Sequence, residues 1–187
     1  MNWRWTAALF GILVVLAAFL LLQNQQEVAE EPTPFPTPVP AVSLLPNVEV
    51  EDVQRLEISR ASDDFAATFV HDEDGLWSRT VPTHTQVISD SMNSQLAGLL
   101  NLSAQSTLPE DANPLSAYGL DSPAYEITVV ALQDGQAVRF SFLIGDETPT
   151  GAGYYLMRQG NPAVRVVLLS PIDSVITLLD NPPTEDL

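Results

Sequence analysis

The chain has 187 residues, of which 24 are acidic and seven are basic, and its formal net charge at pH 7 is −17. All seven basic residues are arginine and the chain contains no cysteine, so disulfides, thiolate chemistry and mechanisms that need a lysine amine are excluded. Nucleic-acid binding is excluded too, because it needs clustered basic side chains to neutralise phosphates.

The first predicted element is a membrane-spanning helix over Thr6–Leu22, a run without charged residues. Its length is close to the roughly 20 residues that a helix needs to cross a bilayer. Trp3 and Trp5 fit an interfacial position, and Arg4 precedes the run while glutamates follow it, which favours a cytoplasmic N-terminus. We expect residues 1–23 to anchor the protein in the plasma membrane by a single pass, with the C-terminal domain extracytoplasmic. A cleaved signal peptide, the alternative, would need small residues at a cleavage site, and Gln-Asn-Gln-Gln-Glu follows instead.

Residues 24–46 are predicted to be an acidic, proline-rich linker. They contain six prolines and three glutamates, a composition that favours extended polyproline geometry and cannot pack a core. We interpret the segment as a spacer; a proline-motif ligand for a partner is the alternative. One outer domain over 47–181 and a disordered tail over 182–187 complete the predicted organisation.

Short runs of alternating apolar residues predict strands in the first part of the outer domain. The first two runs consist of Val53, Leu56 and Ile58, and then Phe65, Ala67 and Phe69. The turn Asp74-Gly75 leads to a third strand from Leu76 and Trp77 to Val81, which Pro82 should end. A small antiparallel meander is therefore expected.

A helix is predicted between Thr85 and Leu102, because the apolar spacing changes there to a helical period. The face expected to pack on the sheet consists of Ile88, Met92, Leu96, Leu99 and Leu100. Polar residues, Asn93 among them, are assigned to the outer face. A ligand groove lined by the same apolar stripe is the alternative.

The second part of the domain contains the clearest hairpin, Tyr125–Leu132 and Gln136–Ile144 joined by Asp134-Gly135. Two more strands are predicted at Tyr154–Met157 and Val164–Leu169, and the second is apolar enough to be central. A short helix through Leu179 should then begin with Ser170 as its N-cap. Strands followed by a helix thus occur twice, so a duplicated half-domain is one hypothesis.

No arrangement of residues predicts catalysis, a metal site or a cofactor site. The acidic cluster Asp72–Gly75 lacks the first and last carboxylates of a calcium loop. Gly151-Ala152-Gly153 leads into a strand, whereas a dinucleotide turn leads into a helix. His71 and His84 do not have the spacing of a zinc-protease motif, and no serine elbow is present.

The segment Leu115-Ser116-Ala117-Tyr118-Gly119-Leu120-Asp121-Ser122-Pro123 resembles the Tyr-Gly-Leu-x-x-Pro signature of the family catalogued as domain of unknown function 4340 (DUF4340). The resemblance covers about residues 48–180. The residues that carry it are Trp77, Pro82, Tyr118, Gly119, Leu120, Pro123, Gly145, Tyr154 and Tyr155.

The resemblance implies a prokaryotic envelope protein with one N-terminal anchor and an outer domain of α+β class. Some relatives are associated with transporter or gliding-type gene clusters, and the family transfers no catalytic residue. Together with the pattern, this predicts a mainly antiparallel sheet with two packed helices.

We interpret the signature residues as structural. Gly119 is expected to adopt a positive φ, Tyr118 and Leu120 to anchor the turn in the core, and Pro123 to stop the local helix. The functional alternative is a ligand contact built by Tyr118, Tyr154 and Tyr155.

The expected function is non-enzymatic binding or scaffolding of another envelope protein, with the lipid bilayer as the anchor's partner. The alternative is an extracellular module that binds a small or polymeric ligand. Its rim would be the loop that contains Asp146, Thr150 and Tyr154.

Overall fold

The computed structural model describes residues 42–72, 74–109 and 114–184. The predicted anchor, Thr6–Leu22, and all but the last five residues of the predicted linker lie outside these ranges. Within them, no helix has the length and apolar character needed to cross a membrane. The folded domain begins earlier than residue 47, since Leu44 and Leu45 are already buried.

The first half of the domain is a meander followed by a helix. Its strands are β2 (Val53–Arg60), β3 (Phe65–His71), β4 (Trp77–Val81) and β5 (Thr85–Gln86), and each pairs antiparallel with the next. Helix α2 (Ser89–Leu100) follows. The predicted meander is confirmed, and β5 is an additional short strand in the segment that was expected to be helical.

The second half repeats this order. Strands β8 (Tyr125–Gln133), β9 (Gln136–Glu147), β10 (Gly153–Arg158) and β11 (Val164–Leu168) pair antiparallel in sequence, and α3 (Leu169–Thr177) follows. The predicted hairpin of β8 and β9 is confirmed. The predicted position of the last strand is wrong, because β11 lies next to the edge strand of the sheet.

Short elements join the halves and extend the sheet. The two 3-10 helices, η1 (Val50–Asp52) and η2 (Leu115–Tyr118), precede β2 and β8 respectively. Strand β1 (Val42–Ser43) pairs with β6 (Ser103–Ala104), and β7 (Ser106–Thr107) pairs with β11 at the edge of the large sheet. Each half therefore has a 3-10 helix, four strands and an α-helix in the same order, an arrangement consistent with duplication.

The two meanders meet at their first strands. In the described residues the large sheet has the order β5-β4-β3-β2-β8-β9-β10-β11-β7. Because β2 and β8 pair antiparallel in the middle, each half extends outward from this junction to its own edge.

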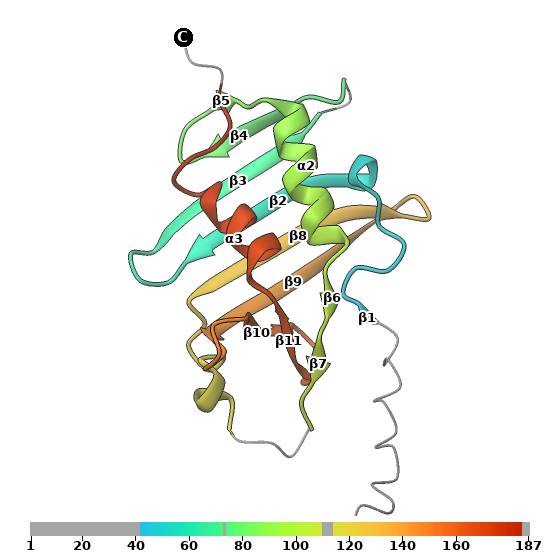
Figure 1. The fold of residues 1–187 in the computed structure, drawn as a ribbon. Helices are drawn as coiled ribbons and strands as arrows, with labels where there is room; N and C mark the ends of the chain where they lie inside the picture. The colour runs from blue at the N-terminus through green and yellow to red at the C-terminus, as the bar shows by residue number, and fades with distance from the viewer. Residues whose placement is uncertain (1–41, 73, 110–113, 185–187) are drawn as a thin grey trace, which may run out of the picture. The chain divides into compact units, whose positions relative to one another are not determined.

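Both helices cover one face of the sheet (Figure 1). The buried side chains of α2 are Met92, Leu96, Leu99 and Leu100. They pack with the inward residues of the strands and with Ile172 and Val175 of α3 in one core. This α+β architecture, a mainly antiparallel sheet with two packed helices, is the one predicted.

Two details at the helix starts differ from the prediction. Ile88 is 40 % exposed, because it is the extended N-cap residue of α2, and Val87 is buried in its place. Helix α3 begins at Leu169 with Leu168 as its N-cap, so Ser170 lies inside the helix and its side chain is not the cap. Strand β11 runs directly into α3, whereas two extended residues, Val87 and Ile88, separate β5 from α2.

The domain also continues past the predicted end at residue 181. The carbonyl oxygen of Pro183 accepts a hydrogen bond from the Ile88 amide at 2.6 Å. Residues 182–184, which the sequence assigned to a disordered tail, therefore lie beside the start of α2. The rest of that tail lies outside the described residues.

Candidate functional site

The Tyr-Gly-Leu signature packs backbone to backbone against β9. Gly119 has φ +67°, as predicted, and a Cβ on Gly145 would lie 2.0 Å from the carbonyl oxygen of Tyr118. A Cβ on Gly119 would meet the Asp146 carboxyl at 2.7 Å. Tyr118 and Leu120 are buried, 8 % and 2 % exposed. Glycine at both positions thus permits a close approach that larger residues would block.

This contact covers part of the sheet face opposite the helices. Tyr118 and Leu120 form a second core cluster with Val164, against which partly buried residues from β9 and β10 pack: Leu143, Tyr155 and Met157. The rings of Tyr118 and Tyr155 lie 4.8 Å apart. The signature therefore acts as a clamp that closes this face over β9, β10 and β11.

Trp77 and its neighbours attach β4 to α2. The indole is fully buried, and its Nε1–H donates to Asn93 Oδ1 at 2.8 Å. The Trp77 amide donates to Ser89 Oγ at 3.0 Å. Asn93 consequently lies toward the sheet and was wrongly assigned to the outer face. Pro82 directly follows the last residue of β4, as predicted.

In the part of the chain that the structure describes, the three predicted rim residues make separate contacts. Tyr154 Oη donates to Asp173 of α3 at 2.9 Å, and burial, followed by this hydrogen bond, raises the pKa of Tyr154. Asp146 lies against Gly119. Thr150 is exposed in the turn after β9, where its hydroxyl lies 3.2 Å from that of Thr148.

The proposed joint contact of three tyrosines is also wrong. Successive side chains of a strand point to opposite faces. Tyr154 packs on the helix side, whereas Tyr155 packs with Tyr118 on the other side. No single ligand can contact all three rings.

The other motifs singled out in the sequence have local structural roles. Asp72 Oδ1 accepts hydrogen bonds from the amides of Asp74 and Leu76, which fixes the tip of the β3–β4 hairpin. Gly151, with φ +65°, turns the chain between β9 and β10. Across the residues that the structure describes, no three side chains are arranged to hold a metal ion.

The shortest ion pairs among the described residues join the end of β2 to its turn and to the C-terminal region. The Arg60 guanidinium contacts Asp63 and Asp180, each at 2.8 Å. The hydrogen bond from Arg60 lowers the pKa of Asp63, and the same contacts raise the pKa of Arg60. These shifts come from surface ion pairs, which also perturb pKa values outside catalytic sites.

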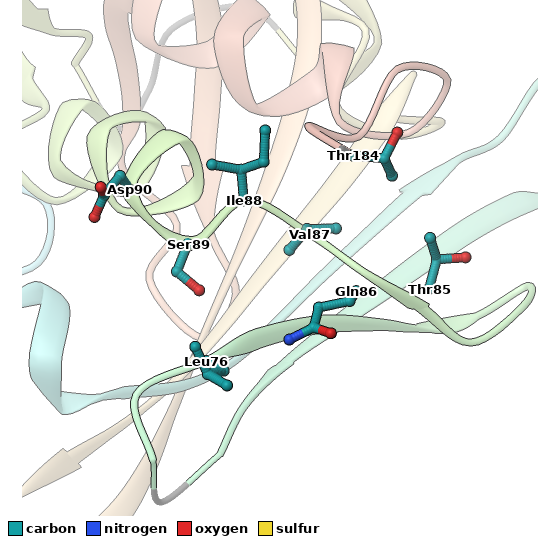
Figure 2. A pocket seen from close by; sticks show the side chains of 8 residues that line it. All are labelled: Leu76, Thr85, Gln86, Val87, Ile88, Ser89, Asp90 and Thr184. Carbon is teal, nitrogen blue, oxygen red and sulfur yellow. The ribbon is translucent and has the colours of Figure 1, made fainter. Parts of the chain in front are cut away.

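Two regions of the described surface remain as candidates. The first is a cavity of about 520 Å³ at the sheet edge near β5. Figure 2 shows that its lining comes from Leu76 before β4, the segment 85–90 and Thr184 after α3. Leu76 and Ile88 are 44 % and 40 % exposed, so this groove has apolar side chains at its surface.

The second candidate is the part of the sheet face that neither the helices nor the clamp covers, which we call the open face. It is formed by side chains of β3, β2, β8 and β9 that point away from the helices. In two cross-strand rows they are Thr68, Glu57, Thr128 and Ser141, and then Val70, Arg55, Val130 and Arg139.

Charged residues span this open face. Arg55 Nη1 lies 3.4 Å from Glu57 Oε1, and Arg139 Nη2 lies 3.2 Å from Glu57 Oε2. Beside them, the hydroxyls of Thr128 and Ser141 form a buried hydrogen bond of 2.7 Å. Two hollows, of about 310 and 480 Å³, share Arg139 as a lining residue.

Sequence reasoning missed the open face. The signal was present as polar residues that alternate with the apolar ones, such as Arg55 and Glu57 between Leu56 and Ile58. What the alternation did not reveal is that β2 pairs with β8 and brings Arg55 into the same row as Arg139.

Comparison with known proteins gives one match. The model of a family described as "Domain of unknown function (DUF4340)" matches residues 77–181. No curated protein and no solved structure matches the chain. The match includes β4, β5 and α2 of the first half and all of the second half with its clamp.

Proposed function

Since the chain belongs to the DUF4340 family of domains of unknown function, we propose that it is a non-enzymatic envelope protein whose outer domain binds another envelope protein. Thr6–Leu22 would anchor it in the plasma membrane by a single pass, and the proline-rich linker would give the domain reach. The apolar run and its flanking charges support the anchor.

The open face is the observation that carries the binding role. Helices cover one side of the sheet, and the clamp covers the other side only over β9 to β11. Strands β3, β2 and β8, whose open face neither α2, α3 nor the clamp covers, lie in the middle of the sheet. There the surface has balanced charge, with Arg55 and Arg139 against Glu57 and Glu126, although the chain as a whole is strongly acidic.

The shape of this surface favours a protein partner. Small-molecule sites usually enclose most of their ligand in a concave cavity. The two hollows on the open face are open to solvent and do not form enclosed cavities. Non-obligate protein interfaces are about as polar as the rest of a protein surface, and arginine is enriched in them.

The test is site-specific photocrosslinking of the full chain in its native membrane. A photoreactive residue replaces Thr68 on the open face or, as the control, exposed Ser94 on α2. We expect one adduct of defined mass from the Thr68 position and no adduct of that mass from the Ser94 position. The Thr68 adduct should be lost when Arg139→Glu is added. The absence of an adduct from Thr68, or the same adduct from both positions, would contradict the proposal.

A small-ligand role is the second candidate, and the groove of Figure 2 favours it. Its volume of about 520 Å³ and the exposed Leu76 and Ile88 suit a partly apolar compound. A compound that raises the melting temperature of the full chain should lose this effect in Leu76→Ser and keep it in Leu115→Ser. Leu115 is 38 % exposed and does not line the groove.

A further inference from the structure

The larger hollow of the open face is unusual in its charge. Its volume is about 480 Å³, and the open-face residues Arg55 and Arg139 contribute to its lining. Of the described residues that line it, none is Asp or Glu. The segment after the predicted anchor has six arginines and all 24 acidic residues, so two arginines beside one hollow are a marked local excess of positive charge.

Glu57 orients both arginines from outside this hollow. Arg139 contacts the carboxylate only through Nη2, and Arg55 contacts it only through Nη1. A guanidinium has five N–H donors in a planar fork. Each arginine thus keeps further donors that the contact with Glu57 does not use. Glu57 is the one carboxylate that contacts both guanidiniums, and Glu126, the other acid of the open face, lines the smaller hollow instead.

From this geometry we propose that the hollow binds a carboxylate, supplied by an acidic side chain of the protein partner. Guanidinium forks match carboxylate geometry and form strong charge-assisted hydrogen bonds. The hydrophobic floor of Val70 and Val130 would contact the carbon chain of a Glu or Asp residue. This assignment names the chemistry of the proposed partner and rests on the proposed function.

The surrounding charge favours an isolated acidic residue over a polyanion. At physiological ionic strength, charges separated by more than about 8 Å are largely screened. A single carboxylate between Arg55 and Arg139 would experience mainly those two cations and the Glu57 carboxylate that contacts them. A polyanion would extend over the acidic remainder of the domain and be repelled.

The first test measures the binding of glutarate, a dicarboxylate probe, to the full chain in lipid nanodiscs. Binding is followed by NMR of the arginine Nε–H signals. We expect saturable shifts of the Arg55 and Arg139 signals and none with glutaramide, the neutral isostere. Arg139→Gln should weaken binding at least about fivefold. The matched control, Arg165→Gln, makes the same charge change on β11, outside the hollow, and should leave binding unchanged.

A second variant keeps the proposal testable if Arg139→Gln disturbs the sheet. Glu57→Gln removes the competing carboxylate and should tighten glutarate binding about twofold or more. Equal shifts with glutaramide, or equal weakening by Arg165→Gln, would overturn the carboxylate site. Because the probe needs no partner protein, glutarate binding without a crosslinked partner would refute the proposed function and the assignment of the carboxylate to a protein partner, and would support the carboxylate site itself.

The source of the carboxylate is tested with two competitors. The peptide acetyl-Gly-Glu-Gly-amide should displace glutarate from both arginines, and its Gln counterpart should not. Long polyglutamate should bind no more tightly per carboxylate than the peptide. Much tighter polyglutamate binding, with shifts of all observable arginines, would overturn the assignment to an isolated acidic residue in favour of an anionic polymer.

Discussion

Replacing Gly145 by alanine should release the clamp that the DUF4340 signature forms on the sheet. An alanine Cβ at this position would lie 2.0 Å from the carbonyl oxygen of Tyr118 and 3.1 Å from Leu120 Cγ. Favourable carbon contacts occur at about 3.5–4.0 Å, so the loop must retreat by about 1.5 Å. The neighbouring atom is backbone, which cannot rotate out of the way as a flexible side chain can.

The cost follows from the side chains that the loop buries. Tyr118 and Leu120 are 8 % and 2 % exposed. Complete burial of a large apolar side chain contributes about 1.5–3 kcal/mol. A retreat that exposes about half of each would lower the free energy of unfolding by roughly 1.5–3 kcal/mol, a sizeable part of the stability of an ordinary domain.

Urea denaturation of the full chain in detergent micelles, followed by circular dichroism, measures this loss. Gly98→Ala is the matched control, because its Cβ would lie 3.9 Å from Pro171 Cβ, an ordinary contact. Since Gly98 is inside α2, alanine there should be neutral or stabilise the protein by up to about 1 kcal/mol. Hydrogen exchange should localise the effect of Gly145→Ala to the clamp. A free energy of unfolding for Gly145→Ala within about 1 kcal/mol of the parent protein would refute the clamp.

Three further substitutions test other contacts. Trp77→Phe removes the donor to Asn93 Oδ1 and shrinks a fully buried side chain, so we expect a loss of about 2 kcal/mol in urea denaturation. The pKa of Tyr154 is raised by burial and by Asp173. The protonated phenol therefore makes its full contribution to the free energy of unfolding below about pH 10, and this contribution is lost as the pH increases further. Tyr154→Phe should make the decrease in the free energy of unfolding at high pH shallower. The pKa of Asp63 is lowered by the adjacent Arg60 guanidinium. The ionised carboxylate therefore contributes to the free energy of unfolding above about pH 4, and this contribution is lost in acid. Asp63→Asn should reduce the loss of stability between about pH 4 and pH 2.

Local patterns in the sequence predicted most of the fold. The alternation from Val138 to Ile144 and the Asp134-Gly135 turn identified the central hairpin. The error at the start of α2 has a clear cause. Ile88 fits the helical spacing to Met92, but the Val87 amide bonds to the Trp77 carbonyl and keeps the chain extended to that point. Spacing alone does not distinguish a helix residue from its cap.

The candidate site was less predictable, because it depends on pairing between distant segments. Arg55 and Arg139 come together only because β2 pairs with β8 and β8 with β9. The sequence showed that each arginine belongs to an outward position of a strand. It did not show which strands are neighbours. The sequence pattern of the second half is as compatible with a separate sheet as with one sheet shared by both halves.

The repeated halves differ on the face opposite the helices. In the second half, η2 leads into the clamp, and the strand residues beneath it are apolar: Leu143, Tyr155 and Met157. In the first half, η1 contacts α2 on the helix side, and the corresponding face is left with Thr68, Glu57 and Arg55. Permanent interfaces resemble a protein core, whereas interfaces between proteins that also exist apart stay polar. The open face therefore suits a partner that associates and dissociates, and the paired Arg139 and Glu57 would keep it soluble between encounters.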